Sequence, residues 1–275
     1  MKSINLFLIL ITALGIISCT SSSDDKSDGG SSSDPTPSLS LDSCQAFSFA
    51  RTKIANGEVC SVGNQNSPLV RLSIEGLGFT GVCTGTVIDR NTVLTAAHCL
   101  QGDIISVVVE STAGSFLSRN FFVPSSYDDS GDVGIDDIGI VKTSIDIPIN
   151  PLPLLLSSDP IIGESAYIGG FGERSPGSID SSPRAGEVIV AGLTSNSVIV
   201  RFQGDQAHPC EGDSGGPLVV DRNGQRAIVG VVSQSDPSVR LDNICRPGDI
   251  TLYTSLTKSS VLSFINQLAP NAGAL

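Results

Sequence analysis

The chain has 275 residues and a mass of 28.4 kDa, which is enough for one large domain or for two small ones with a shared core. Its formal net charge of −12 and sequence pI near 4.4 argue against nucleic-acid binding, which needs a basic surface. Only 16% of the residues are charged, whereas Gly numbers 29 and Trp is absent. This composition favours short strands and tight turns over helix bundles or coiled coils.

The chain contains seven cysteines and two histidines, His98 and His208. Each histidine lies close to a cysteine in the sequence, but no two cysteines have the C-x-x-C spacing that is typical of zinc modules. We therefore expect neither a metal site nor a cofactor.

The N-terminus begins with Met1-Lys2 and continues into an apolar run, Ile4–Ile17. At roughly 1.5 Å per residue this run is too short to cross a bilayer core of about 30 Å comfortably, so residues 1–18 are predicted to be a secretory signal peptide. The run ends at a Cys19 whose context resembles the lipobox of bacterial lipoproteins. That resemblance implies lipidation of Cys19; the alternative is an ordinary signal peptide with a chance cysteine.

Residues 19–43 consist almost entirely of Ser, Asp, Gly, Thr and Pro. Such a segment cannot bury a core, so it is predicted to be a solvated tether. With the lipobox, it predicts an exported protein that is lipid-anchored to a bacterial membrane, at the outer membrane or cell surface, or otherwise secreted or periplasmic. Export would also put the remaining cysteines in an oxidising compartment.

Three short segments carry residue types that suit nucleophilic catalysis. They are Leu94–Cys99, Asp136–Lys142 and Gly212–Pro217. A serine hydroxyl is a poor nucleophile at neutral pH and needs a base such as imidazole, which a carboxylate orients and stabilises. Together, in the order His, Asp, Ser, the segments resemble the trypsin/chymotrypsin family of serine proteases, from about Ile54 to the C-terminus. Each segment alone has a simpler interpretation as a turn, a buried histidine or an acidic loop, but their joint occurrence favours catalysis.

The resemblance implies a role for each residue. His98 would be general base and then general acid, Asp137 would orient it, and Ser214 would attack the scissile carbonyl. The amides of Gly212 and Ser214 would form the oxyanion hole, where glycine can adopt a backbone conformation closed to other residues. Asp136 is a competing acid, but Asp137 is preferred because the family's acid immediately precedes an apolar strand.

The residues that the resemblance assigns to substrate binding depart from the family pattern. Ser233 resembles the serine that hydrogen-bonds the triad carboxylate and begins the strand that pairs with substrate; an ordinary strand serine is the alternative. Gln234 and Ser235 stand where the family usually has Trp and often has Gly. His208 stands at the base of the pocket, where trypsin-type enzymes have Asp, so nothing supports cleavage after Lys or Arg. With Ser235 on the wall, His208 would suit a polar or acidic side chain, or it is a structural histidine.

A basic segment before an Ile-Ala-Asn-Gly sequence resembles the family's activation junction. Cleavage between Lys53 and Ile54 would free an ammonium that pairs with Asp213, which would allow the oxyanion loop to form because an unpaired buried carboxylate is costly. Residues 44–53 would then be a propeptide and 54–275 the protease domain; a plain basic turn is the alternative. Because the pocket does not favour basic side chains, we expect a separate protease to cut this bond.

The cysteine pairing follows from the same resemblance. It implies a disulfide Cys83–Cys99, which would fasten the histidine loop, and a disulfide Cys210–Cys245, which would tie the serine loop to the far wall of the pocket. Cys44–Cys60 then remains as the third pair and would hold the propeptide on the domain after cleavage.

Short runs rich in β-branched residues, separated by Gly, Pro, Asn and Asp, predict an all-β protein. The predicted strands are Leu69–Ile74, Gly85–Leu94, Ile104–Val109, Ala166–Gly170, Glu187–Ala191, Ser197–Phe202 and Ala227–Ser233. One helix is predicted after Ser259-Ser260, where apolar residues recur at helical spacing. With the resemblance, this pattern implies two packed six-stranded antiparallel β-barrels with a cleft between them.

These observations predict a lipid-anchored, monomeric serine endopeptidase that acts on protein or peptide substrates. The alternative is a pseudoprotease that serves as a surface binding or adhesion lipoprotein. A periplasmic quality-control protease is a third interpretation, but Asp213 and the junction at Ile54 argue against it.

Overall fold

The computed structural model describes residues 43–47, 53–54, 57–59, 66–130, 135–173, 182–201, 207–235 and 250–275. The chain divides into two units, and all of these residues belong to the second unit, Ser40–Leu275. The predicted signal peptide, Cys19 and nearly all of the tether lie outside the described residues. None of the helices in the described ranges has the length and apolar character needed to cross a membrane.

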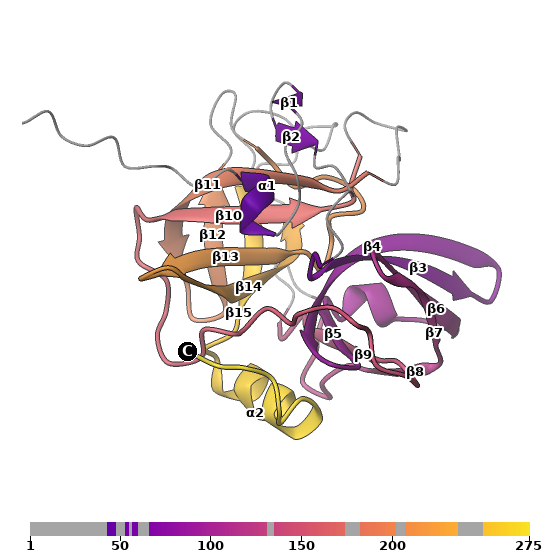
Figure 1. Ribbon diagram of the computed structural model, residues 1–275. Coiled ribbons are helices and arrows are strands. Elements are labelled where there is room, and N and C mark those ends of the chain that lie inside the picture. The colour runs from indigo at the N-terminus through magenta and orange to yellow at the C-terminus, as the bar shows by residue number, and fades with distance from the viewer. Residues whose placement is uncertain are drawn as a thin grey trace, which may run out of the picture. The chain divides into compact units, whose positions relative to one another are not determined.

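The first sheet is antiparallel and has the strand order β7-β6-β3-β4-β5-β9-β8 (Figure 1). Its strands are β3 (Leu69–Gly76), β4 (Phe79–Asp89), β5 (Thr92–Thr95), β6 (Ile104–Ser111), β7 (Gly114–Ser118), β8 (Asn120–Phe122) and β9 (Gly139–Lys142). The edge strands β7 and β8 are separated in the sequence by Arg119 alone. The chain itself therefore brings the two edges together, and the sheet curls into a barrel.

The second sheet has the order β1-β2-β11-β10-β13-β14-β15-β12, and an additional pairing of β11 with β12 closes six of its strands into a barrel. Its strands are β1 (Lys53–Ile54), β2 (Gly57–Val59), β10 (Ser165–Gly170), β11 (Arg184–Leu193), β12 (Ser197–Arg201), β13 (Pro217–Arg222), β14 (Gln225–Ser235) and β15 (Ile250–Ser255). The hairpin β1–β2 is attached to the edge of this barrel through β11.

Alternating side chains explain why these segments form barrels. In β11, Val188 and Val190 are buried in the interior of the second barrel, whereas Glu187 and Ile189 are exposed, as the twofold period of a strand requires.

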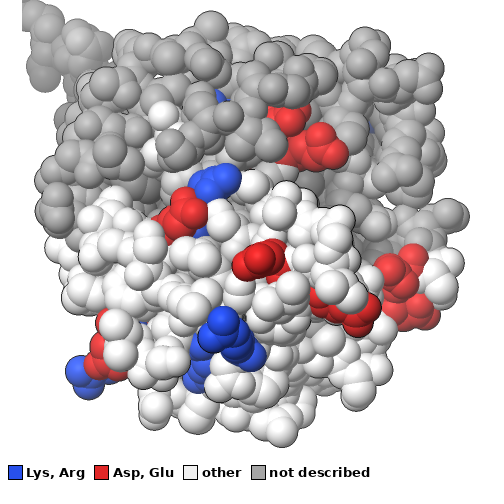
Figure 2. Space-filling model, turned by 90° about the vertical axis from the view of Figure 1, so that its right-hand side faces the viewer, with Lys and Arg blue, Asp and Glu red and all other residues white. Residues whose placement is uncertain are grey.

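Figure 2 shows the outside of one face, on which single charged side chains and small groups of them are scattered among uncharged residues.

The predicted all-β class and the two antiparallel barrels are confirmed, although the first sheet has seven strands where six were predicted. The C-terminal helix α2 (Ser259–Leu268), which buries one apolar face, is confirmed as well. The predicted strand Gly85–Leu94 is wrong in two respects, and the first is its start, since β4 already begins at Phe79. A two-residue turn at Arg90 and Asn91 divides it into the paired strands β4 and β5. An asparagine in so short a turn is a typical hairpin signal, and the apolar residues on both sides obscured it.

Residues that were predicted to form a propeptide belong to the folded core. The short helix α1 (Ser43–Ala46) was not predicted, and Cys44, Ala46 and Phe47 are at most 2% exposed. A Cβ atom on Gly169 of β10 would lie 2.8 Å from the Phe47 ring and 2.6 Å from Leu69. The Phe47 ring therefore occupies the space that glycine leaves on this strand. The folded unit begins before the predicted cleavage point.

We expect Phe47→Ala to lower the free energy of unfolding by about 3 kcal/mol or more, because it removes a fully buried ring. Denaturant unfolding of the uncut chain measures this effect. Phe79→Ala is the matched control, since Phe79 is 44% exposed and its loss should cost about 1 kcal/mol or less. Equal losses for the two variants would show that the N-terminal segment is not part of the core.

Candidate active site

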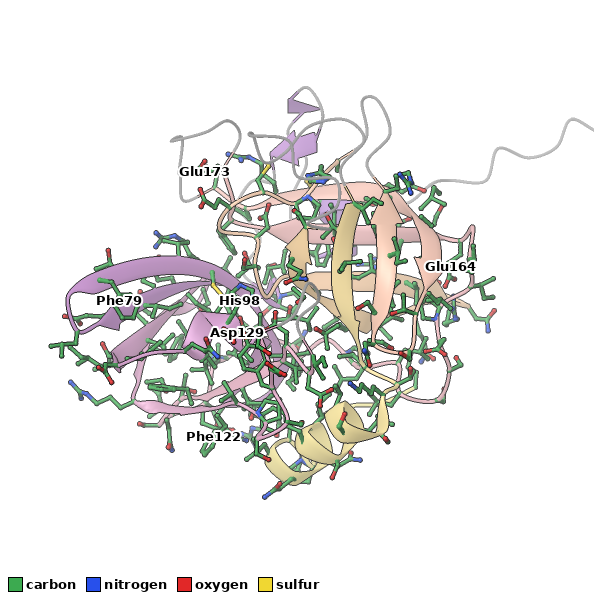
Figure 3. All side chains as sticks on the ribbon, turned by 180° about the vertical axis from the view of Figure 1, so that it is seen from behind. Phe79, His98, Phe122, Asp129, Glu164 and Glu173 are labelled. Atoms are coloured by element: carbon green, nitrogen blue, oxygen red, sulfur yellow. A yellow bond between two sulfur atoms is a disulfide. The ribbon has the colours of Figure 1, made fainter. Side chains whose placement is uncertain are left out.

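His98 lies where the first barrel meets the second, and its ring is one-third exposed (Figure 3). It begins a 3₁₀ helix, His98–Leu100, directly after β5 and two buried alanines. The next residue, Cys99, forms a disulfide with Cys83 of β4. This disulfide confirms the predicted pair and fastens the histidine segment to the neighbouring strand.

Asp137 holds His98 by two hydrogen bonds. Its Oδ2 accepts from the ring Nδ1 at 2.8 Å, and its Oδ1 accepts from the His98 backbone N–H at 2.9 Å. Asp137 is only 3% exposed. A buried carboxylate that accepts from Nδ1 assigns the ring proton to that nitrogen, which leaves Nε2, on the other side of the ring, able to accept a proton.

Two residues of the second barrel complete the environment of Asp137. The Ser233 hydroxyl on β14 donates to Asp137 Oδ2 at 2.6 Å, and Thr254 Oγ1 on β15 donates to the Asp137 carbonyl oxygen at 2.9 Å. The predicted contact of Ser233 with the carboxylate is therefore present. The competing acid, Asp136, contacts Lys258 and Ser260 instead of His98.

The Ser214 loop comes from the second barrel and is bound to the first. The Ser214 carbonyl accepts from the Thr84 backbone N–H at 2.8 Å, and Cys99 Sγ lies 3.8 Å from the same oxygen. Thr84 Oγ1 also donates to the Gly212 carbonyl at 2.9 Å. These contacts hold Ser214 beside the residue that follows His98. The described contacts include no hydrogen bond between Ser214 Oγ and the His98 ring, a contact that often tightens only when substrate binds.

Two glycines allow this close approach. Gly212 has a φ of 93°, which confirms the unusual backbone conformation expected for it. Gly215 has a φ of 81°, and a Cβ there would lie 2.1 Å from Thr95 Oγ1 and 2.5 Å from the Thr84 carbonyl oxygen. A side chain at Gly215 would therefore separate the serine loop from the barrel that carries His98.

Asp213 accepts hydrogen bonds from the backbone N–H groups of Gly172, at 2.7 Å, and Cys210, at 2.8 Å. Burial raises the pKa of this carboxyl to about 6, although these two N–H groups and the nearby Arg184 charge act to lower it. Among the described residues, no Lys or Arg forms an ion pair with Asp213. In the described part of the chain, its directly bound partners are therefore neutral backbone N–H groups.

Asp213 lines a cavity of about 70 Å³ at the end of the second barrel. Other lining residues include Gly170, Arg184, His208 and Val232. This volume exceeds what a single water needs.

The other predicted pocket residues lie at the same end of the barrel. His208 Nε2 is 3.4 Å from Thr251 Oγ1, and Ser235 is paired with Thr251 across β14 and β15. His208 thus has a protein partner as well as a place in the cavity wall. Gln234, which stands in the family's usual Trp position, lies between Ser233 and Ser235 on β14.

Lys53 and Ile54, the two residues of the predicted cleavage point, form β1. The strand paired with it, β2, is hydrogen-bonded to β11 at Arg184 and Ala185, two residues that line the Asp213 cavity.

Cys44 and Cys210 are each disulfide-bonded. Their predicted partners, Cys60 and Cys245, lie outside the described residues, so these two pairings stay predictions.

Sequence reasoning missed Thr84, Thr254 and Lys258, which support the site without belonging to a recognisable motif. Thr84 acts on a residue 128 positions away, and Thr254 acts on one 117 positions away. No local pattern marks such residues, because only the fold brings them to the site.

A family model described as Trypsin matches residues 54–259. The sequence is 29% identical over 174 residues to trypsin delta of Drosophila melanogaster, which covers 55% of this chain and 67% of that protein. It is 28% identical over 179 residues to a collagenase of Hypoderma lineatum, with 55% and 65% coverage. It is 25% identical over 218 residues to chymotrypsin-like elastase family member 1 of Rattus norvegicus, with 70% and 82% coverage.

The match covers about two thirds of the length of the two insect relatives. The family model spans most of this chain, begins at Ile54 and includes His98, Asp137 and Ser214. The two barrels agree with that match. The chain belongs to the trypsin family of serine endopeptidases.

Proposed function

We propose that this chain hydrolyses peptide bonds in proteins or peptides through a triad of His98, Asp137 and Ser214. The observation that supports it most is the buried Asp137 carboxylate, which binds both the ring and the backbone of His98. A carboxylate in this position stabilises the imidazolium that forms when the ring takes a proton. The Ser214 loop lies beside the same residue pair.

In the proposed reaction, Ser214 Oγ attacks the scissile carbonyl carbon while His98 Nε2 takes the hydroxyl proton. The carbonyl oxygen becomes an oxyanion, which the N–H groups of Gly212 and Ser214 stabilise. The tetrahedral intermediate collapses, the C–N bond breaks, and His98 donates its proton to the leaving amine. Water then repeats the sequence on the acyl-enzyme, releases the acid product and restores Ser214.

The proposal includes activation by cleavage between Lys53 and Ile54. The cavity beside Asp213 supports this step, since it lies next to a buried carboxyl with which none of the described Lys or Arg side chains forms an ion pair. Only β2 separates β1 from β11, which lines that cavity. A new Ile54 ammonium that entered it would pair with Asp213 and favour its ionised form.

The proposal also assigns a location and partners. A signal peptide over residues 1–18 would export the chain, and a lipid on Cys19 followed by the tether would hold it at a bacterial membrane. The lipobox-like sequence and the spacer composition support this location. The buried Phe47 supports retention of the propeptide after cleavage. A separate protease would cut at Lys53, because His208 replaces the acid that favours basic substrates.

A fluorophosphonate probe tests the catalytic proposal. After limited trypsin cutting, we expect labelling at Ser214 and none in Ser214→Ala. Ser115→Ala is the control, because this exposed serine lies on β7. Cleavage of a peptide library should fall roughly 10⁴-fold or more in Ser214→Ala and in His98→Ala. A folded, cut protein that is not labelled would support the pseudoprotease alternative.

Asp213 should make the stability of the uncut chain depend on pH. Its folded pKa of about 6 exceeds the usual 3.8, so the folded state binds the proton more tightly than the unfolded state does. The resulting stability is fully present below about pH 3.8 and is lost as the pH rises through about 6. We therefore expect the Tm of the uncut protein, relative to that of Asp213→Asn, to decrease from pH 4 to pH 7.

Both proteins in this pH comparison should carry Ser214→Ala, which prevents self-digestion. Cutting between Lys53 and Ile54 should reverse the trend, since an ammonium beside Asp213 lowers its pKa. A Tm difference that is independent of pH before and after cutting would contradict this account of Asp213.

A further inference from the structure

Asp136, the neighbour of the proposed catalytic acid, has an unusual backbone conformation. Its φ is 53°, and the other non-glycine with positive φ among the described residues is Asn223, in the β13–β14 hairpin turn. The Ile138 N–H donates to the Asp136 carbonyl at 2.8 Å. This bond closes a tight turn that has Asp137 at its centre. The direction of the Asp137 side chain therefore depends on how Asp136 is held.

The Asp136 side chain is 2% exposed and is bound by the start of helix α2. Its Oδ1 accepts from Lys258 Nζ and from Ser260 Oγ, each at 2.9 Å. Burial acts to raise the pKa of Asp136, but hydrogen bonds from Ser126, Lys258 and Ser260 outweigh it and lower the pKa. The carboxylate is thus a buried anion whose cationic partner, Lys258, is itself only 22% exposed.

The segment that leads into helix α2 also forms a hydrogen bond with Asp137. Thr254 Oγ1 donates to its carbonyl oxygen, four residues before Lys258. Helix α2 is fixed in turn by Val261 and Ile265, which are at most 1% exposed. The C-terminal segment therefore contacts both residues of the turn, at the side chain of Asp136 and at the carbonyl oxygen of Asp137.

We propose that the buried ion pair between Lys258 and Asp136 positions the Asp137 carboxylate and, through it, the His98 ring. This inference rests on the proposed function. Without the Lys258 charge, the Asp136 carboxylate would be a buried anion with no cation, which proteins avoid by moving the group or protonating it. Either change disturbs the turn and shifts the Asp137 oxygens relative to His98 Nδ1. Lys258 and Asp136 are positioning residues and touch no reacting atom.

Kinetics of the trypsin-activated protein test this role. We expect Lys258→Met to lower kcat on the order of 10- to 100-fold while KM changes less than about threefold. The reason is that the substitution changes the orientation of the triad and leaves the residues that bind substrate in place. Lys258→Arg should restore most of kcat, since it keeps the cation. Arg90→Met is the control: it removes an exposed ion pair with Asp146 and should change neither constant. An unchanged kcat in Lys258→Met would overturn the proposal.

The double variant Asp136→Asn with Lys258→Met keeps the inference testable where the single variant is poorly folded. It leaves no unpaired buried charge, and Asn is tolerated at positive φ. Its loss in kcat should be smaller than the product of the two single losses, because both act through one pair. Losses that simply multiply would show that the two residues act separately and would overturn the inference.

A nuclear magnetic resonance measurement separates this inference from the proposed function. The chain has two histidines, so ¹⁵N-histidine labelling gives two rings, and His208→Gln assigns them. Lys258→Met should shift or broaden the His98 Nδ1 proton resonance, and Lys258→Arg should restore it. An unchanged resonance would overturn the positioning role. A wild-type protein that is inert to substrate and to fluorophosphonate would overturn the proposed function while this spectrum still tests the inference.

Discussion

A buried carboxylate must be surrounded by hydrogen-bond donors, and Asp137 satisfies this requirement with groups from both barrels. His98 supplies two donors from the first barrel, and Ser233 supplies a third from the second. Because an unpaired carboxylate in this place would be costly, these bonds resist any sliding of one barrel relative to the other. The arrangement of the site and the packing of the domain therefore depend on the same interactions.

The serine loop is fixed by a second set of contacts between the barrels. Thr84 binds the main chain on both sides of Asp213, at Gly212 and at Ser214. Gly215 makes this approach possible, since its missing side chain leaves room for Thr95. The nucleophile's loop is thus shaped by the barrel that carries the proposed base as well as by its own. A loop built in this way has little freedom to drift away from His98.

Much of this site could be predicted from short motifs, because His98 and Ser214 stand in local patterns whose order is informative. Asp136 and Asp137 are adjacent in the sequence, and Asp137 was preferred because the resemblance places the acid directly before an apolar strand. The contacts of the two side chains in the fold agree with that preference. The contacts of Lys258 could not be predicted, since its partner lies more than 100 residues earlier and no periodicity links them. The helix near Phe47 was missed for a related reason: four residues are too few for a helical pattern.

The packing of Phe47 against β10 affects how a mechanical force on the N-terminal segment would reach the site. Phe47 packs against Gly169, and the next residue on β10, Gly170, has room for the Asp213 carboxylate only because it lacks a side chain. Phe47 and the Asp213 carboxylate therefore contact two neighbouring residues of one strand. Tension applied to the N-terminal end of the folded unit would be transmitted through α1 into β10 and also into β11 and β2, which α1 contacts as well. A pull on this segment would therefore act on Gly169, which is next to the glycine that faces the Asp213 carboxylate.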